Sequence, residues 1–523
     1  MASGTAGTVA TATVQARDLV MAALPGPTLD AGGESLLRDG CAGGVCLYGR
    51  NVVDPAQLLA LTDSIRAIVG RDALVACDLE GGHVWRLRPP ATHWPSAMAF
   101  GAANRPDLTR RAATMAAREF RAMGIDAPFA PVADVNDHPR NPVIGTRAFG
   151  STPALVARHV TAAIGGYREG GVASCTKHFP GHGHTDTDSH HALPVLAHDR
   201  TRLDSIDLVP FGAAIRAGVD MVMVAHLLVR AIDGENPASL SPAVVTGLLR
   251  ERLGFRGVIV SDALDMRAIA DTYGLGEAAV RAVAAGCDLV AFNAPIAEAR
   301  KVHDALAKAI ESGRLPPVQV AASVARVRAM RRALNRNPRP PLEIVGDPSH
   351  VATADEVARR ALTSTGATTG WLATGVHPIP GGVVVIEFDP RLPFADPNVH
   401  APPLRMADAL RERLPEATAL ILSPAEWVDR APEALAAIAG AGRVIVATRN
   451  AWKDERQRTA IAAIAETARQ LAVIALRDPQ DAMILPGAIS VATYGDDAAS
   501  VRAALAWLLD GVPAPGTLAT GLS

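Results

Sequence analysis

Eight short apolar runs alternate with amphipathic patterns over the first two-thirds of the chain, and this alternation limits the fold more than any other feature. Between the runs, apolar residues recur at three- and four-residue spacing, which indicates helices. Continuous apolar strands separated by helices indicate a parallel sheet covered on both faces. Eight such units predict an α/β fold with a (β/α)8 barrel. The predicted strands are residues 19–24, 45–48, 73–78, 126–131, 173–177, 219–226, 257–262 and 288–293, and the predicted helices include 55–69, 108–123, 153–168, 242–253 and 277–285.

A breaker-rich segment follows the predicted barrel, whose last helix covers residues 318–334. The next fifteen residues, "NRNPRPPLEIVGDPS", contain four prolines and a glycine, which predicts a linker. A helix at 354–362 leads into a second alternation of strands (382–387, 419–422, 443–448, 472–476 and 489–493) and helices (403–414 and 498–509). We therefore expect a catalytic barrel at residues 1–334, a linker with a connecting helix at 335–370, and a smaller α/β sandwich domain at 371–523.

The charge and the cysteines narrow the class of protein. A net charge of -2 over 523 residues gives no reason to expect nucleic acid or a membrane surface as a partner. The N-terminal sequence lacks a basic region followed by a continuous apolar core, and no apolar run approaches the ~20 residues of a transmembrane helix. We expect a cytoplasmic monomer or homodimer. The five cysteines are odd in number and mostly lie in apolar runs, so we expect reduced core residues.

Polar side chains end several of the predicted strands. In a (β/α)8 barrel, the C-terminal ends of the strands and the loops after them form the active site. We therefore expect these side chains to face one active site. They are Asp78, Lys177 with His178, His226, Asp262 and Asn293.

Asp262 closes the apolar strand of "GFRGVIVSDALDM". A carboxylate at this position can act as a nucleophile, a base or a metal ligand. Asp265, three residues later, is expected to point elsewhere at the start of the next helix. The alternative interpretation of Asp262 is a helix N-cap.

Two segments carry arginines near glycines. In "ACDLEGGHVWRL", Asp78 ends a strand, two glycines permit a tight turn, and Arg86 follows. An Asp–Arg pair suits a polyhydroxylated ligand, because the carboxylate accepts hydrogen bonds from hydroxyls and the guanidinium donates to them. In "NPVIGTRAFG", Arg147 lies in a glycine-containing loop, and taken alone it is interpreted as a solvated surface arginine.

The stretch "KHFPGHGHTDTDSHH", residues 177–191, holds five of the chain's fifteen histidines. Its proline and glycines predict an irregular loop. One hypothesis makes His182 and His184 an H-x-H metal pair in a barrel hydrolase. Metal-dependent amidohydrolase barrels carry such a pair after the first strand, whereas this one follows about the fifth.

The second hypothesis for the same stretch is an acid/base dyad. Asp188 and His190 lie two residues apart, so in an extended segment both side chains project to the same side. The carboxylate can then hold the tautomer of the imidazole and raise its pKa, as general acid/base work near neutrality requires. The dyad would work opposite Asp262.

Four blocks of sequence, in order, resemble family 3 glycoside hydrolases, and most closely the β-N-acetylhexosaminidase branch in its two-domain form. The blocks are "DLEGGHVWRL", "VIGTRAFG", "KHFPGHG" followed by "TDTDSHHALP", and "GFRGVIVSDALDM". The resemblance extends more loosely to the second domain through "VIALRDPQDA" and "SVATYGDDAASVRAALAWLL". His83 departs from the family, which usually has a charged residue, often arginine, at that position.

The resemblance implies a retaining, exo-acting β-N-acetylglucosaminidase that acts on a small carbohydrate and needs no metal or organic cofactor. Asp262 would be the nucleophile, His190 the acid/base and Asp188 its dyad partner. The residues implied to bind the terminal sugar are Asp78, Arg86, Arg147, Lys177 and His178.

Several functional alternatives stay open. Some relatives use phosphate instead of water and some accept glucosides, so the alternatives include a β-N-acetylglucosaminide phosphorylase and a broad β-glucosidase. An inactive sugar-binding relative is a third, which the presence of Asp262, Asp188 and His190 disfavours. The natural glycan is not determined by the sequence.

Overall fold

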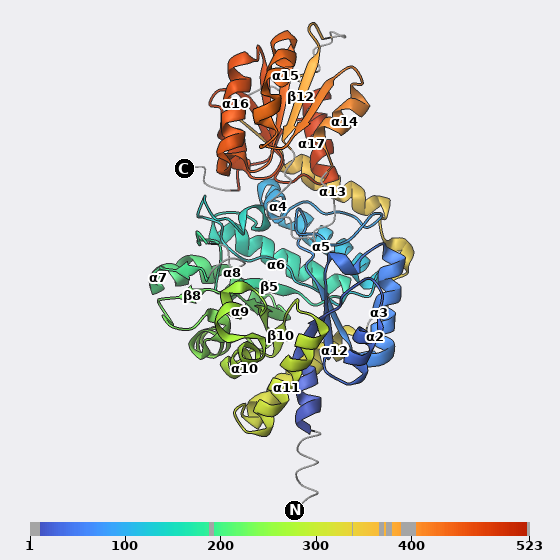
Figure 1. Ribbon diagram of the computed structural model, residues 1–523, viewed down its shortest axis with the longest axis vertical. Helices are drawn as coiled ribbons and strands as arrows, with labels where there is room; N and C mark the ends of the chain where they lie inside the picture. Colours follow the sequence, from blue (N-terminus) through green and yellow to red (C-terminus); the bar gives the residue numbers. More distant parts are fainter. Residues whose placement is uncertain are drawn as a thin grey trace, which may run out of the picture. The chain divides into compact units, whose positions relative to one another are not determined.

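The structure is a computed structural model that describes residues 11–187, 193–336, 338–365, 371–372, 379–388 and 404–519. The chain forms two compact units (Figure 1). The first consists of Met1–Glu80, Arg86–Thr92 and Thr109–Asp347, and the second of Gly81–Trp85, His93–Leu108 and Pro348–Ser523. The second unit therefore takes two short segments from the N-terminal part of the chain.

The first unit is built on an eight-stranded sheet in which every neighbouring pair is parallel. The strands are β1 Val20–Ala23, β2 Gly44–Leu47, β3 Leu74–Cys77, β4 Ala127–Pro128, β5 Cys175–Phe179, β7 Met221–Val224, β9 Val258–Ala263 and β10 Leu289–Ala291. Their order is β4-β3-β2-β1-β10-β9-β7-β5. Ala173 donates its N–H to the carbonyl of Asp126 (2.8 Å) and Cys175 to that of Ala130 (2.8 Å), which joins the two ends of the sheet. The predicted (β/α)8 barrel is confirmed.

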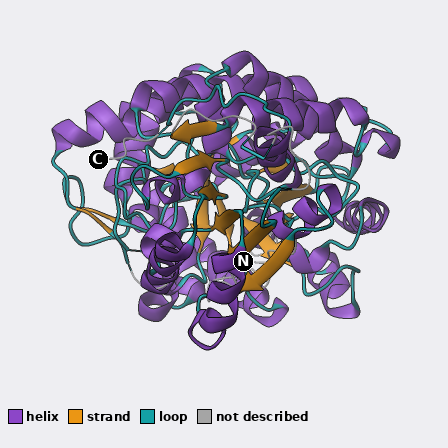
Figure 2. Ribbon diagram, turned by 90° about the horizontal axis from the view of Figure 1, so that it is seen from above, coloured by secondary structure: helices purple, strands orange, loops and turns teal. Residues whose placement is uncertain are grey.

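Helices surround these strands (Figure 2). They are α2 Ala31–Arg38, α3 Pro55–Val69, α5 Pro106–Ala122, α6 Pro153–Gly170, α7 Arg200–Arg202, α8 Leu208–Arg216, α9 Arg267–Tyr273, α10 Leu275–Ala285, α11 Ile296–Glu311 and α12 Pro317–Leu334, with π-helices η3 Leu203–Asp207 and η5 Ala243–Arg252. Short strands β6 Val195–Leu196 and β8 Leu228–Val229 form a separate parallel pair. Within the described ranges, no helix has the length and apolar character needed to span a membrane.

Local signals explain the bounds of a typical barrel helix. Helix α3 begins after Asp54, whose side chain accepts a hydrogen bond from the N–H of Gln57, and Pro55 occupies the first turn. It ends at Gly70, which adopts φ 105°. The sequence predicted these bounds because residues next to each end of the helix determine where it begins and ends.

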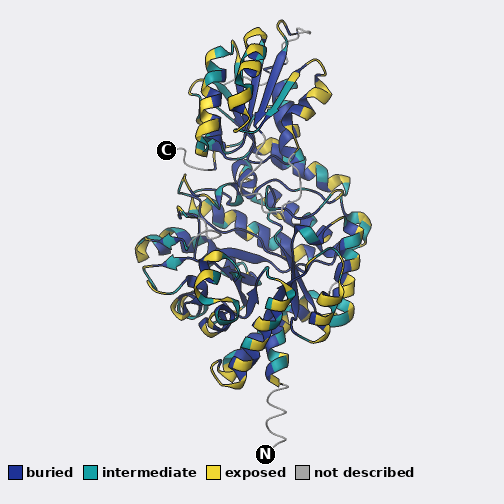
Figure 3. Ribbon diagram, in the orientation of Figure 1, coloured by how far each residue is buried: buried dark blue, intermediate teal, exposed yellow. Residues whose placement is uncertain are grey.

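The barrel interior is filled by side chains from all eight strands. Met21, Leu74, Phe129, Met223 and Val260 belong to one buried cluster in this interior. In Figure 3 the strands are dark blue, and exposed residues lie on the helices and loops around them. All five cysteines are free and buried, as expected for core residues.

The second unit contains a six-stranded sheet in the order β11-β16-β15-β14-β12-β13. Its strands are β11 Thr363–Thr365, β12 Val383–Phe388, β13 Thr418–Leu422, β14 Arg443–Thr448, β15 Leu471–Ala475 and β16 Ile489–Ala492. Five strands are parallel, and β11 pairs antiparallel with β16 at the edge. The sequence predicted the five parallel strands but not β11.

Helices cover both faces of this sheet, which confirms the predicted α/β sandwich. Helices α15 and α16 share a buried cluster with alternate residues of β12 and β14, while α13 and α14 pack against α17. The helices are α4 Ala97–Ala103, α13 Pro348–Ala361, α14 Met406–Arg413, α15 Trp427–Gly440, α16 Glu455–Thr467 and α17 Ala498–Leu509. The start of the helix predicted at 403–414 lies outside the described residues.

Candidate active site

Charged side chains gather at the carboxyl ends of the barrel strands. Asp78 directly follows β3, Lys177 lies in β5, and Asp262 lies near the end of β9. Burial raises the pKa of the Cys175 thiol inside the barrel; nearby Lys177 opposes the shift, and Asp78, Asp262 and Asp220 add to it. Because the strands are parallel, Asp78 and Asp262 lie at one end of the barrel, and the 2.8 Å contact of Lys177 with Asp78 brings the ammonium group to the same end.

Lys177 joins β5 to the segment after β3. Its ammonium group donates to Oδ1 of Asp78 at 2.8 Å and lies 2.6 Å from Oε1 of Glu80. The Lys177 side chain is only 2% exposed. Burial alone would lower the pKa of Lys177, but the two carboxylates raise it above its ordinary value. Lys177 is therefore a fixed cation at neutral pH.

Arg147 is not the solvated surface arginine that its loop suggested. Its Nε and Nη2 donate to the two oxygens of Glu80, each at 2.8 Å, and its side chain is 11% exposed. Burial alone would raise the pKa of Glu80, but Arg147 and Lys177 hold it far below the usual range. The interpretation of Arg147 as a surface residue, taken from its loop alone, was wrong, because its partner Glu80 lies 67 residues away in the chain.

Arg86 returns to Asp78 after a tight turn. The distance from Nη2 of Arg86 to Oδ2 of Asp78 is 3.8 Å. The turn needs glycine at position 81, which adopts φ 94° and where a Cβ would lie 2.5 Å from the carbonyl oxygen of Pro95. Burial raises the pKa of Asp78, but Lys177 and Arg86 bring it below its ordinary value. The predicted Asp78–Arg86 pair is present.

His178 is held between an acid and an arginine. Its Nδ1 lies 2.7 Å from Oδ2 of Asp134, and its Nε2 lies 3.0 Å from Nη2 of Arg147. A guanidinium only donates, so Nε2 must accept and Nδ1 carries the proton. Asp134 also accepts the backbone N–H of His182 at 2.7 Å and thereby fixes the start of the histidine-rich loop.

The ring nitrogens of His182 and His184 lie next to different residues. Nδ1 of His182 lies 2.7 Å from Oγ1 of Thr185, whereas Nδ1 of His184 lies 2.6 Å from Oδ1 of Asp137. Burial lowers the pKa of His182 to about 4, and His178 adds to the shift. Among the described residues, no group of three or more His, Cys, Asp or Glu side chains has an arrangement that could hold a metal ion.

Asp207 is a buried acid beneath the same loop. It ends η3, and a Cβ added at Gly181 would lie 2.9 Å from its Cβ. Neither carboxyl oxygen has a hydrogen-bond partner among the described residues. Burial raises the pKa of Asp207 to about 7, with Arg202 opposing the shift.

Asp262 is a strand residue and not a helix N-cap. Helix α9 begins at Arg267 and is capped by Met266, so the alternative interpretation was wrong. Oδ1 of Asp262 accepts the N–H of Ala263 at 2.8 Å. Nε2 of the buried His226 lies 3.0 Å from the carbonyl oxygen of Ala263, which supports the strand beside this carboxylate.

The last strand-end residues have structural partners. Oδ1 of Asp265 accepts the backbone N–H of Asn293 at 2.6 Å, and the side chain of Asn293 accepts from Arg50 at 2.6 Å. Asp188 and His190, the predicted dyad, lie outside the described residues.

Two residues that the sequence analysis did not single out complete the cluster. Glu80 binds two of the cations, and Asp134 binds His178. Glu80 stands inside the quoted "DLEGG" block and Asp134 soon after a strand end, so position in a motif was the available signal. With them, three acids (Asp78, Glu80, Asp134) balance three cations (Arg86, Arg147, Lys177).

Comparison with known families shows to which family of proteins the chain belongs. The family model described as "Glycosyl hydrolase family 3 N terminal domain" matches residues 16–330. The chain belongs to glycosyl hydrolase family 3. The predicted resemblance is confirmed, and the protein is a glycoside hydrolase.

Individual proteins similar to this chain agree with this assignment. A "Beta-hexosaminidase" of Methylococcus capsulatus is 41% identical over 280 residues, which span 53% of this chain and 83% of the relative. A "Beta-hexosaminidase A" of Pseudoalteromonas piscicida is 34% identical over 352 residues, which span 61% of this chain and 59% of the relative. A family 3 beta-N-acetylglucosaminidase structure from Paenibacillus sp. FPU-7 matches with TM-score 0.89 and 34% identity, over 98% of this chain and 99% of that one.

Proposed function

We propose that the protein is a retaining, exo-acting β-N-acetylhexosaminidase that removes terminal β-linked N-acetylglucosamine. The meeting of three predicted sugar-binding residues, Asp78, Arg147 and Lys177, in one partly buried cluster at the carboxyl ends of the barrel strands carries the proposal. The names of the similar proteins, beta-hexosaminidase and beta-N-acetylglucosaminidase, support the choice of sugar.

In this proposal Asp262 attacks the anomeric carbon and forms a covalent glycosyl-aspartate. Its place near the end of β9 and the N–H of Ala263 on Oδ1 support this role, because a nucleophile must be held in one orientation. The C–O bond to the leaving group breaks as the bond to Asp262 forms. Water then attacks the same carbon and releases the sugar with its configuration retained.

His190 supplies the proton to the leaving oxygen and later removes one from water, with Asp188 holding its imidazole. Most retaining glycosidases use a second carboxylate for this step. A histidine leaves one fewer negative charge near the anomeric carbon, so an anionic acceptor is repelled less. Phosphorolysis is therefore the alternative that the experiment must separate from hydrolysis.

Asp78, Arg86, Arg147 and Lys177 bind the hydroxyls of the terminal sugar. Lys177 has three N–H donors, and its ammonium group has two partners among the described residues, Asp78 and Glu80. Both ring nitrogens of His178 are engaged by Asp134 and Arg147, so His178 acts by orienting Arg147 as well as by lining the site.

Turnover of an aryl β-N-acetylglucosaminide, measured with and without inorganic phosphate, tests this function. We expect free N-acetylglucosamine as the product in both buffers. A sugar 1-phosphate in the phosphate buffer would identify a phosphorylase, and faster turnover of the aryl β-glucoside would identify a broad β-glucosidase. Absence of turnover in either buffer would leave only a sugar-binding role.

Three further predictions belong with this function. We propose domain boundaries at 1–334, 335–370 and 371–523, which limited proteolysis tests. We propose a cytoplasmic location, which cell fractionation tests. We propose a monomer or homodimer, which analytical ultracentrifugation tests.

A further inference from the structure

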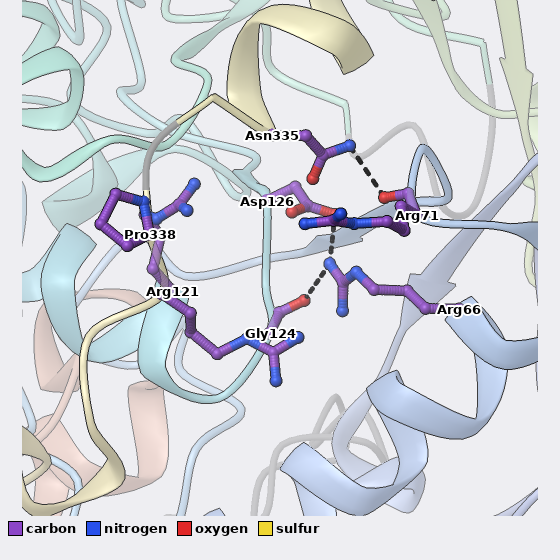
Figure 4. A pocket seen from close by; sticks show the side chains of 8 residues that line it. Arg66, Arg71, Arg121, Gly124, Asp126, Asn335 and Pro338 are labelled. Atoms are coloured by element: carbon purple, nitrogen blue, oxygen red, sulfur yellow. Dashed lines mark hydrogen bonds and ion pairs between the residues drawn. The ribbon is translucent and has the colours of Figure 1, made fainter.

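A cavity lined by arginines lies at the amino ends of barrel strands. Its lining includes residues just before β3 and β4 and just after α12, whereas the active site lies at the carboxyl ends of the strands. Its volume is about 320 Å³. Figure 4 shows these side chains, which are Arg66, Arg71, Arg121, Gly124, Asp126, Asn335, Pro338 and Arg339.

The lining carries four guanidinium groups and one carboxylate, which is a formal charge of +3. The carboxylate of Asp126 is already engaged, since its Oδ2 accepts from Arg66 at 2.7 Å and from the N–H of Val75 at 2.9 Å. Arg339 pairs at 2.8 Å with Asp63, which is half exposed. Asp72, at the rim, accepts from Asn335. Positive charge therefore exceeds negative charge in the cavity.

Arg121 is buried in this positive environment and is 9% exposed. Its Nη1 donates to the carbonyl oxygens of Gly171 at 2.8 Å and Leu334 at 3.1 Å. Burial lowers the pKa of Arg121; Asp126 opposes the shift, and Arg66 and Arg339 add to it. The neighbouring cations therefore destabilise the charged form of Arg121, and a bound anion would reverse that effect.

Contacts that stabilise the fold explain only some of the arginines that line this cavity. Arg66 and Arg121 bind backbone carbonyls of the barrel, which is a structural role. The exposed Arg71 has no side-chain partner in the part of the chain that the structure describes. Asn335 fixes the backbone of Arg71 by donating to its carbonyl oxygen at 2.8 Å (Figure 4). Because its backbone is fixed and it lies beside a positive cavity, Arg71 is suited to bind a ligand through its side chain.

We propose that this cavity binds a compact anion bearing one or two phosphoryl groups. A single carboxylate such as Asp126 pairs with one arginine, Arg66, whereas a pyrophosphate or phosphate ester offers more charge and more oxygens. One guanidinium group can donate two hydrogen bonds to two oxygens of the same phosphate. The volume lies at the lower end of ligand cavities, which run from about 300 to 1,000 Å³, so the ligand is small.

Isothermal titration of the full-length protein with pyrophosphate tests the proposal, with inorganic phosphate and a sugar phosphate as separate arms to distinguish free anion from ester. We expect saturable binding of at least one of the three. The double variant Arg71→Ala/Arg339→Ala should raise the Kd at least about tenfold, because hydrogen bonds between charged groups are lost. Arg216→Ala removes an exposed arginine outside the cavity lining and should leave the Kd within about twofold, since it changes only distant charge.

Thermal melting without ligand checks that the double variant folds, and Arg71→Gln provides a milder change if it does not. Turnover in phosphate-free buffer should equal that of the wild type, because neither arginine belongs to the active site. Equal Kd values in the wild type and the double variant would overturn the proposal. Absence of saturable binding of all three anions, or binding of all three that is no tighter than that of sulfate, would also overturn it.

Discussion

Replacing Glu80 with glutamine tests the charge balance of the active site. Glu80 is 3% exposed and lies between Lys177 (2.6 Å) and Arg147 (2.8 Å to both carboxylate oxygens). Glutamine keeps the shape of the side chain but removes its charge, so the active-site cluster then has three cations and two acids. Breaking a buried ion pair by removing one partner costs about 3–5 kcal/mol. Because the amide oxygen still accepts one hydrogen bond, we expect about 3 kcal/mol of destabilisation.

Thermal melting measures this loss, which should lower the melting temperature of the barrel by at least about 5 °C. Glu34→Gln is the matched control, because Glu34 pairs with Arg38 at 2.6 Å but its side chain is 43% exposed. Exposed pairs of this kind contribute about 0.3–0.5 kcal/mol, so the control should melt within about 1 °C of the wild type.

Kinetics with the aryl β-N-acetylglucosaminide measure the effect on the site. Lys177 and Arg147 lose their common partner in Glu80→Gln, so we expect KM to rise about tenfold with a smaller change in kcat. Equal melting temperatures and equal KM values for the Glu80 and Glu34 variants would refute the reasoning.

Three other changes test separate parts of the account. Asp262→Asn should lower kcat at least about a thousandfold without lowering the melting temperature, as expected for loss of a nucleophile; retained turnover would remove Asp262 from the mechanism. Asp207→Asn should change how stability depends on pH. The pKa of Asp207 rises from its ordinary value of 3.8 to about 7 in the folded wild type. Between these two pH values the folded state binds more protons than the unfolded state, so wild-type stability falls as pH rises. Urea titrations at pH 4 and pH 8 should show that the variant gains up to roughly 4 kcal/mol over the wild type at pH 8 only, and an equal difference at both values would contradict the burial argument. EDTA should leave turnover unchanged, whereas loss of activity restored by zinc would favour a metal pair at His182 and His184.

The barrel could be predicted from sequence because its signals are local. Each strand is a short apolar run, and helices such as α3 have capping residues at both ends. The antiparallel strand β11 was missed, since three residues carry no periodicity and its pairing with β16 is set by the sheet. The π-helix η5 was predicted as a helix, but its hydrogen-bond spacing has no local sequence signal.

The active site could be predicted in part. Asp78, Lys177 and Asp262 stand at strand ends, where the barrel geometry requires site residues to be. Glu80 and Asp134 stand in a motif and soon after a strand end, but their partners lie 67 and 44 positions away, so no local pattern reveals what they bind. For the same reason Arg147 was interpreted as a surface residue from its loop alone, and only the family resemblance assigned it to the sugar-binding residues.

Mass spectrometry of the enzyme after reaction with a slow fluorinated N-acetylglucosaminide tests whether Asp262 forms a covalent glycosyl intermediate. A retaining mechanism predicts a protein heavier by one sugar residue, with the mass carried by the peptide that contains Asp262. Asp262→Asn should carry no such mass. An unmodified wild-type protein that releases product of inverted configuration, or a sugar attached to another residue, would contradict the account.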